Sequence, residues 1–81
     1  MMKIEVLGMG CPKCKKLFQN AQQAVEKSGI QAEVIKVEDL NKITDYGVMM
    51  TPALVLDGKV KATGKIPNVQ EIVNWIKEKT Q

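Results

Sequence analysis

Apolar residues change their spacing twice in the first half of the chain, and each spacing predicts a different element. In Lys3–Leu7 they alternate with polar residues, which predicts a short strand. In Lys15–Lys27 they recur every three or four positions, which predicts a helix that Ser28-Gly29 closes. Ala32–Val37 alternates again and contains Val and Ile, so we expect a second strand. It follows a helical crossover and should therefore lie parallel to the first strand.

A short helix and a hairpin are predicted in the middle of the chain. Residues 40–46 carry apolar side chains at helical spacing, and we expect this helix to end at Gly47. Ala53–Leu56 and Lys59–Thr63 are rich in β-forming residues and flank Asp57-Gly58. This dipeptide is a strong signal for a tight two-residue turn, so the two runs should form an antiparallel hairpin.

A final helix should follow residue 68. Asn68 and Glu71 have the spacing of a capping box, in which each side chain bonds the other residue's backbone N–H. The apolar face of this helix is expected to consist of Val69, Ile72, Val73 and Ile76. The predicted order is βαβαββα, an α/β fold with a four-stranded mixed sheet flanked by helices. With 81 residues, of which 44% are hydrophobic, the chain should form a single domain over residues 1–81.

The cluster Cys11-Pro12-Lys13-Cys14 carries the reactive side chains of the chain and lies where the first strand gives way to the first helix. Two thiols at this spacing indicate a redox or metal-thiolate site. The unpaired N–H groups of a helix's first turn favour an anion, so Cys11 should ionise more readily than an ordinary cysteine. We expect Cys11, which is nearer the loop, to be the nucleophile and Cys14 to be the resolving thiol.

The lysines beside the thiols offer two interpretations. Lys13, Lys15 and Lys16 would add positive potential that favours the thiolate, and Lys13 lies within the motif itself. The same lysines could instead form a solvated helix face. The sequence leaves both interpretations open.

Charge and hydropathy exclude several classes of function. All basic residues are lysine, the formal net charge is +3, and the three aromatic residues are dispersed, so nucleic-acid binding is poorly supported. No apolar run approaches about 18 residues, and the amino terminus lacks the apolar region of a signal peptide. We therefore expect a cytoplasmic protein without a membrane segment. In a reducing compartment, two closely spaced cysteines are more often catalytic or metal-binding than structural.

A second motif gives the chain a resemblance to a known family. Tyr46–Leu56 reads Y-G-V-M-M-T-P-A-L-V-L and is followed by the predicted turn Asp57–Val60. Together with the C-P-x-C of the first motif, this passage resembles the thioredoxin family over nearly the whole chain. The resemblance implies a minimal thioredoxin-like fold and a thiol–disulfide oxidoreductase that needs no cofactor besides a Cys11–Cys14 disulfide. It also implies disulfide-containing protein substrates and a reductase or small thiol as electron donor, and we expect a monomer.

The motif differs in detail from those of the two best-known groups of this superfamily. Gly10 and Pro12 stand where thioredoxins usually have tryptophan and glycine, so the motif is closer to that of glutaredoxins. However, Thr63–Pro67 does not match the turn with which glutaredoxins bind glutathione. The chain is most similar to the small archaeal and bacterial thioredoxin-like proteins, and the sequence does not identify its reductant.

The resemblance assigns roles to three further residues. Pro52 would follow a cis peptide bond and face the cysteines, where it would block metal ions, and the backbone of Thr51 would pair with a substrate beside Cys11. Glu5 stands six residues before Cys11, the offset at which thioredoxins place a buried acid that relays a proton to the second cysteine. From the strand alternation alone, however, we expect Glu5 to face outward.

Methionines near both motifs suggest an adaptable apolar groove. Methionine conforms to varied partners, and Met9, Met49 and Met50 all lie close to the two motifs. Met50 is the preferred groove residue because it is nearest to Pro52 among them.

A metal-carrying function is the alternative. Gly8–Cys14 also resembles the G-M-x-C-x-x-C of heavy-metal-associated domains, and two thiolates suit Cu(I). Closed tetrahedral zinc is a poorer candidate because the chain has two cysteines and no histidine. A cluster held between two chains with glutathione is a more remote option. The carrier domains follow a βαββαβ order that ends in a strand, whereas this chain is predicted to end in a helix, so we expect no bound metal.

Overall fold

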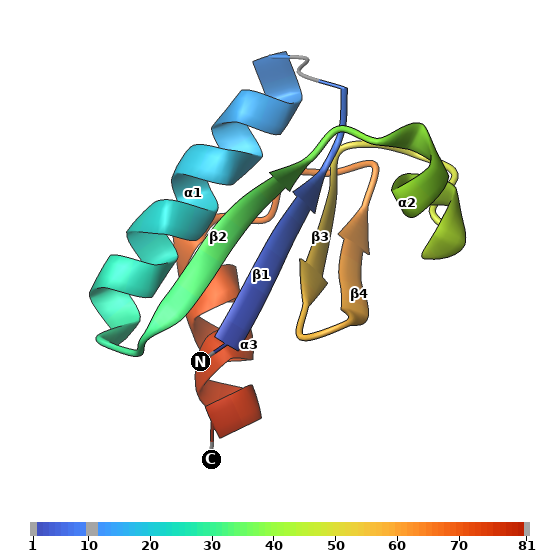
Figure 1. Cartoon of the computed structure of the whole chain (residues 1–81). Coiled ribbons are helices and arrows are strands. Elements are labelled where there is room, and N and C mark those ends of the chain that lie inside the picture. The colour runs from blue at the N-terminus through green and yellow to red at the C-terminus, as the bar shows by residue number, and fades with distance from the viewer. Residues whose placement is uncertain (1, 10–11, 81) are drawn as a thin grey trace.

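The computed structural model describes residues 2–9 and 12–80 and confirms the predicted order βαβαββα. Figure 1 shows a twisted sheet with helices around it, and both termini lie at the end of the sheet away from the first turn of the first helix. The elements are β1 (Met2–Leu7), α1 (Pro12–Ser28), β2 (Ala32–Val37), α2 (Leu40–Asp45), β3 (Ala53–Leu56), β4 (Lys59–Thr63) and α3 (Val69–Thr80).

The four described strands form one mixed sheet in the order β2-β1-β3-β4. β1 and β2 are parallel, with Leu7 opposite Val37, as the helical crossover predicts. β3 pairs antiparallel with both β1 and β4. Asp57 and Gly58 join β3 to β4 with φ angles of 48° and 86°, the left-handed conformation that a two-residue hairpin turn requires. The predicted hairpin is therefore confirmed.

Local hydrogen bonds confirm the predicted ends of the longer helices. α1 closes with a bond from Ser28 Oγ to the carbonyl oxygen of Val25 at 2.9 Å, and Gly29 follows with a φ of 69°. α3 begins with the predicted capping box. Asn68 Oδ1 accepts the Glu71 N–H at 2.8 Å, and Glu71 Oε1 accepts the Asn68 N–H at 3.3 Å. None of the helices in the described ranges is long and apolar enough to cross a membrane.

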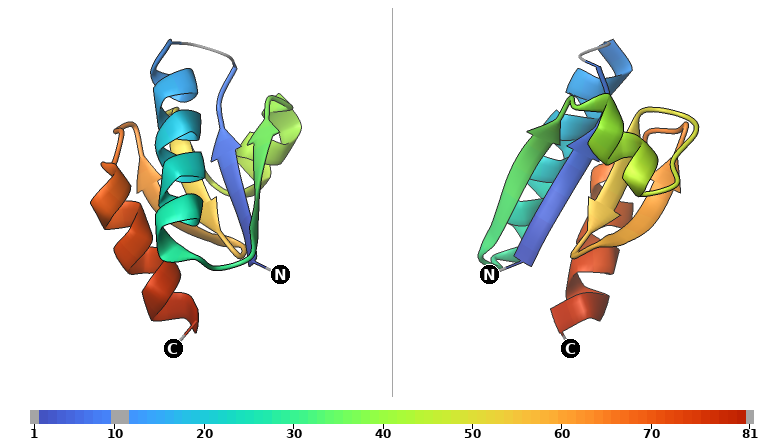
Figure 2. Two further views of the ribbon diagram at one scale, coloured as in Figure 1. Left: turned by 90° about the vertical axis from the view of Figure 1, so that its left-hand side faces the viewer. Right: turned by 45° about the vertical axis from the view of Figure 1, so that its right-hand side comes forward.

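The helices divide the molecule into layers, because α1 and α3 cover one face of the sheet and α2 covers the other (Figure 2). The core beneath α1 and α3 contains Ile4, Val6, Leu17, Ala21, Ala24, Leu54, Leu56, Ile72, Val73 and Ile76. The smaller core beneath α2 contains Leu7, Val37, Ile43, Val48, Ala53 and Val55. Leu7 and Val37 are the last residues of the parallel strands, so α2 is anchored at the end of the sheet where β1 leads toward α1.

Candidate active site

The site is built where β1 ends against the first turn of α1. The Gly8 N–H donates to the Val37 carbonyl oxygen at 3.0 Å, so the backbone continues the parallel ladder one residue beyond β1. Cys14 lies in the first turn of α1, as predicted, and its side chain is only 6% exposed. A Cβ placed on Gly8 would overlap Cys14 Sγ and would lie 3.9 Å from Thr51 Cβ. Glycine is therefore required at position 8 for Cys14 and Thr51 to converge on this strand end.

The other residues of the cysteine motif can be placed only in part. Cys11, predicted to be the nucleophile, lies outside the described residues. Lys13, Lys15 and Lys16 are exposed, and the first turn of α1 contains no acidic residue. Lys15, rather than Lys13, lines a cavity together with Cys14.

Pro52 has the conformation that the family resemblance implies, because the Thr51-Pro52 peptide bond is cis. Pro52 is buried, and its carbonyl oxygen accepts the Gly64 N–H at 2.9 Å. The next residue, Ala53, is paired with Leu7 across β1 and β3. This pairing holds the exposed Thr51 beside the end of β1, where Gly8 and Cys14 also lie.

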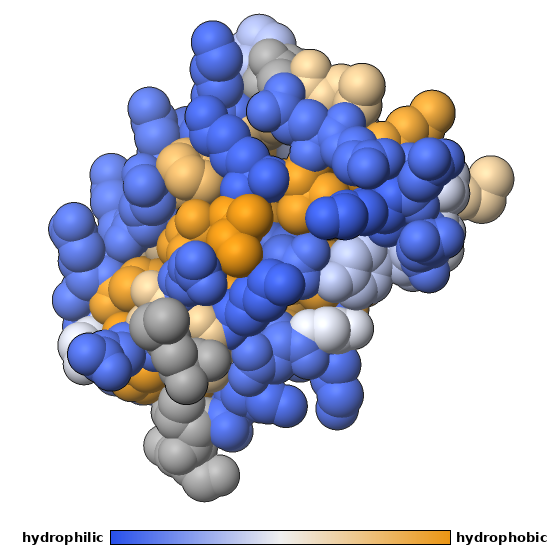
Figure 3. Space-filling view, viewed as in Figure 1, coloured by the Kyte–Doolittle hydropathy of each residue, from blue (hydrophilic) through white to orange (hydrophobic). Residues whose placement is uncertain are grey.

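An apolar groove of about 320 Å³ lies between α2 and the loop before Pro52. Met49 is 96% exposed, and with Met9 it gives the groove two thioether side chains. Figure 3 shows apolar atoms at the surface around α2, among polar side chains. Met50, which we preferred as the groove residue, does not line this groove. It packs against Gly64, where a Cβ would lie 3.1 Å from Met50 Cε. The lining residues are Met9, Leu40, Ile43, Thr44, Val48, Met49 and Thr51.

Glu5 lies on the face of β1 opposite Val6, as the alternation predicts, but the structure corrects its expected exposure to solvent. Its side chain is 7% exposed and accepts a hydrogen bond from the Tyr46 hydroxyl at 2.7 Å. The expectation of an outward-facing glutamate was wrong because Tyr46, the C-cap residue of α2, covers this part of the sheet. Val6, on the opposite face of β1, lines a cavity with Cys14. Glu5 and Cys14 thus approach β1 from different faces, and the relay role of Glu5 stays a prediction.

The bond to Glu5 changes the acidity of Tyr46. The pKa of Tyr46 is raised above its ordinary value of 10.0, first by the hydrogen bond to Glu5, then by burial, and then by the negative charge of Glu5. The neutral phenol is therefore favoured in the folded protein. Because the folded pKa exceeds the unfolded one, this contribution to stability is complete below about pH 10 and is lost as the pH rises through the folded pKa.

This hydrogen bond can be tested by titration, because Tyr46 is the only tyrosine in the chain. We expect the ultraviolet absorbance of its phenolate to develop above pH 10.0 in the folded protein. Glu5→Gln keeps a hydrogen-bond acceptor but removes the charge, so the midpoint should move toward the ordinary value. Glu33→Gln, at an exposed position of β2, changes the net charge equally and should leave the midpoint in place. Equal shifts in the two variants would contradict the assignment.

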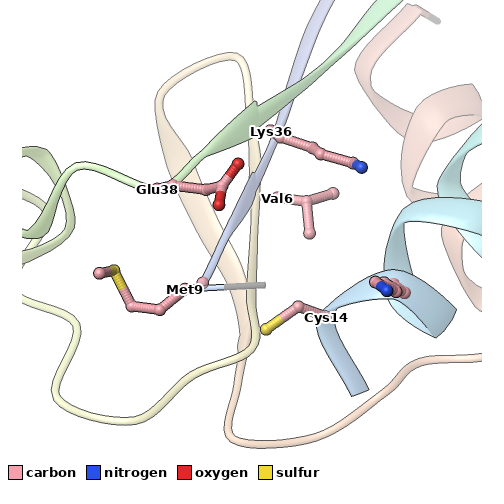
Figure 4. A pocket seen from close by; sticks show the side chains of 7 residues that line it. Val6, Met9, Cys14, Lys36 and Glu38 are labelled. Carbon is pink, nitrogen blue, oxygen red and sulfur yellow. The ribbon is translucent and has the colours of Figure 1, made fainter. Parts of the chain in front are cut away.

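Two side chains at the end of β2 were missed by the sequence analysis. Lys36 and Glu38 line a cavity of about 380 Å³ together with Cys14, Val6 and Met9 (Figure 4). One signal could have located them. β2 was predicted to run parallel to β1, and the carboxyl ends of parallel strands meet at the same edge of a sheet, where ligands commonly bind.

Comparisons with known proteins agree with this geometry. A family model described as a thioredoxin domain matches residues 2–77. A thioredoxin from Methanocaldococcus jannaschii is 43% identical over 77 residues, which cover 95% of this chain and 88% of that protein. A thioredoxin from Methanothermobacter thermautotrophicus is 39% identical over 72 residues, which cover 89% of this chain and 94% of the relative. A probable thioredoxin from Methanothermobacter marburgensis is 29% identical over 85 residues, which cover 100% of this chain and 99% of that relative.

Proposed function

Because this chain belongs to the thioredoxin family of thiol–disulfide oxidoreductases, we propose that Cys11 and Cys14 are its redox-active pair. The observation that carries the proposal is the convergence of Cys14, Gly8 and Thr51 at the end of β1. This arrangement places a buried thiol in a helix's first turn, next to an exposed loop that a substrate can reach. A dithiol here can exchange with a disulfide without a bound cofactor.

The exchange has two steps. The Cys11 thiolate attacks one sulfur of a substrate disulfide, a mixed disulfide forms, and the other substrate sulfur leaves as a thiolate. The Cys14 thiol then loses its proton and attacks Cys11 Sγ, which releases the second substrate sulfur. The substrate gains two electrons and two protons in total, one proton from Cys14 and one from water, and the protein is left with a Cys11–Cys14 disulfide. Lys13 and the helix's first turn favour the Cys11 thiolate that begins the sequence.

We assign substrate binding to the surface around Thr51 and Pro52. An extended segment of a disulfide-containing protein would pair with the backbone of Thr51 and place apolar side chains in the groove beside α2. Met49 is well suited to this role because its exposed, flexible side chain can adapt to different partners. Met50, which packs on Gly64 and is exposed, would contact the substrate outside the groove. The same proposal includes a reductase or small thiol as electron donor, a monomer and a cytoplasmic location.

The copper-carrier alternative has less support. Its resemblance is confined to Gly8–Cys14, because the described elements follow the order βαβαββα, whereas those carriers have a second consecutive strand where this chain has α2. The cis bond before Pro52 has no counterpart in the motif of those carriers. We therefore assign oxidoreductase activity and no metal site.

A reduction assay on a model protein disulfide tests the proposal. The protein is supplied in parallel with thioredoxin reductase and its nicotinamide donor, with glutathione and its reductase, and with a small dithiol. In at least one of the three arms, we expect the protein to raise the rate of disulfide reduction well above that of the same reductant alone. The most effective donor then identifies the class of the physiological reductant. Catalysis in none of the arms, together with tight binding of one Cu(I) by the reduced protein, would favour the carrier instead.

A further inference from the structure

Tyr46 stands between the two walls of the apolar groove without lining it. Met9 apart, the lining residues form one wall on α2 and another on the loop before Pro52: Leu40, Ile43 and Thr44, then Val48, Met49 and Thr51. Tyr46 is the C-cap residue of α2 and comes two residues before the second wall begins. Contacts that fix Tyr46 on the sheet therefore also fix how the two walls meet.

The helix α2 has little apolar packing of its own with which to hold its place. It consists of six residues, of which Ile43 is the buried one. A helix this short is unstable in isolation, so contacts with the rest of the molecule must determine where it lies. The Thr44 hydroxyl donates within α2 itself, to carbonyl oxygens at 2.9 and 3.1 Å. The position of α2 on the sheet thus depends strongly on the residues at its ends.

The Tyr46 hydroxyl links the carboxyl end of α2 to the centre of the sheet. It donates to Glu5 Oε1 at 2.7 Å, and Glu5 lies on β1 between Ile35 of β2 and Val55 of β3. The Glu5 side chain is 7% exposed and lies beside the apolar core beneath α2. A carboxyl group is more costly to bury in such a place than an aliphatic side chain, even when it is hydrogen-bonded. The value of this pair therefore lies in fixing the place of the tyrosine hydroxyl rather than in net stability.

The loop between α2 and β3 is anchored at both ends. At its far end Pro52 is buried, and its carbonyl oxygen accepts the Gly64 N–H at 2.9 Å. At its near end the Gly47 N–H donates to the Thr44 carbonyl oxygen at 2.8 Å, which ties the loop to α2. Residues 49–51 between these anchors are exposed. A displacement at the end of α2 would therefore reach the backbone to which we assign substrate pairing.

We propose that Tyr46 is a positioning residue for protein substrates. Its bond to Glu5 holds α2 and residues 48–51 in the arrangement that receives a substrate segment, and Tyr46 itself touches no substrate. The proposal rests on the substrate surface assigned above. The relay role expected for Glu5 concerns the proton of Cys14 and would affect every disulfide alike. Positioning, in contrast, affects only substrates large enough to occupy the groove, so the two roles give different results.

Two disulfides of different size separate positioning from thiol chemistry. The reduced protein is mixed with an excess of a model protein disulfide or of hydroxyethyl disulfide, and acid quenching, alkylation and mass spectrometry of the protein give the two rate constants. We expect Tyr46→Phe to lower the ratio of the protein-disulfide rate to the small-disulfide rate about threefold or more. Glu5→Leu should lower it equally, and the double variant no further, because either change removes the same bond. Glu5→Gln keeps an acceptor and should hold the ratio near that of the wild type, whatever it does to both rates.

Ser28→Ala is the matched control for a general loss of stability. It removes a hydroxyl hydrogen bond at the end of α1 away from Cys14 and should leave the ratio unchanged. A readout independent of activity is the ¹H–¹⁵N spectrum, in which Tyr46→Phe, but not Ser28→Ala, should shift the amide signals of residues 48–51. An unchanged ratio in Tyr46→Phe, an equal fall in Ser28→Ala, or unshifted amide signals would overturn the inference. In each of these cases, reduction of the protein disulfide by the wild type would still support the proposed function.

Discussion

Cys11→Ser is expected to lower protein-disulfide reduction to the rate of the reductant alone, whereas Cys14→Ser should stall as a mixed disulfide with its substrate. Without Cys11 no thiolate at the helix's first turn can attack, and Cys14 is too buried, at 6% exposure, to reach a protein disulfide. Without Cys14 the first step proceeds but nothing releases the substrate. Non-reducing electrophoresis of each variant with a disulfide-containing protein should show a covalent complex only for Cys14→Ser.

Alkylation of the reduced wild-type protein provides the control for these roles. Iodoacetamide at neutral pH should label Cys11 well before Cys14, because a thiolate reacts and a buried thiol is protected. Peptide mapping after short exposure assigns the label. Faster labelling of Cys14, or a covalent complex formed by Cys11→Ser instead, would reverse the two roles.

Local signals predicted most of the fold. The Asp57-Gly58 turn and the capping box between Asn68 and Glu71 depend on residues close in sequence, and both form as expected. The position of Cys14 in α1 follows from the same kind of signal. The cis bond before Pro52 is different, because it was expected only from the family resemblance.

Features that depend on packing between distant segments were missed. The burial of Glu5 requires Tyr46, which is 41 residues away along the chain, to cover the sheet. A period-two pattern identifies the two faces of a strand but not what lies over each of them. Met50 was assigned by its nearness to Pro52 in sequence, whereas its side chain packs on Gly64. Glu38 was missed because it carries no motif and becomes notable only beside Cys14.

Gly8→Ala should disturb the site strongly although it adds a single methyl group. The added Cβ would overlap Cys14 Sγ, and the strand end holds its backbone through the bond from Gly8 to Val37. The conflict must therefore be relieved by displacing Cys14 or the end of β1. Overpacking of this kind costs about 1–3 kcal/mol of stability. We also expect slower disulfide reduction, because Cys14 must lie within reach of Cys11 to resolve the mixed disulfide.

A double-mutant cycle with Cys14→Ala shows whether the sulfur is the cause. Urea unfolding of the wild type, both single variants and the double variant gives the coupling energy between the two positions. If the clash is with Sγ, Gly8→Ala should lower the free energy of unfolding much less in the Cys14→Ala background than in the wild type. The coupling energy between the two positions should then be about 1 kcal/mol or more. An equal cost in both backgrounds would mean that position 8 needs glycine for a different reason. The close approach of Cys14 to β1 would then not be what restricts position 8.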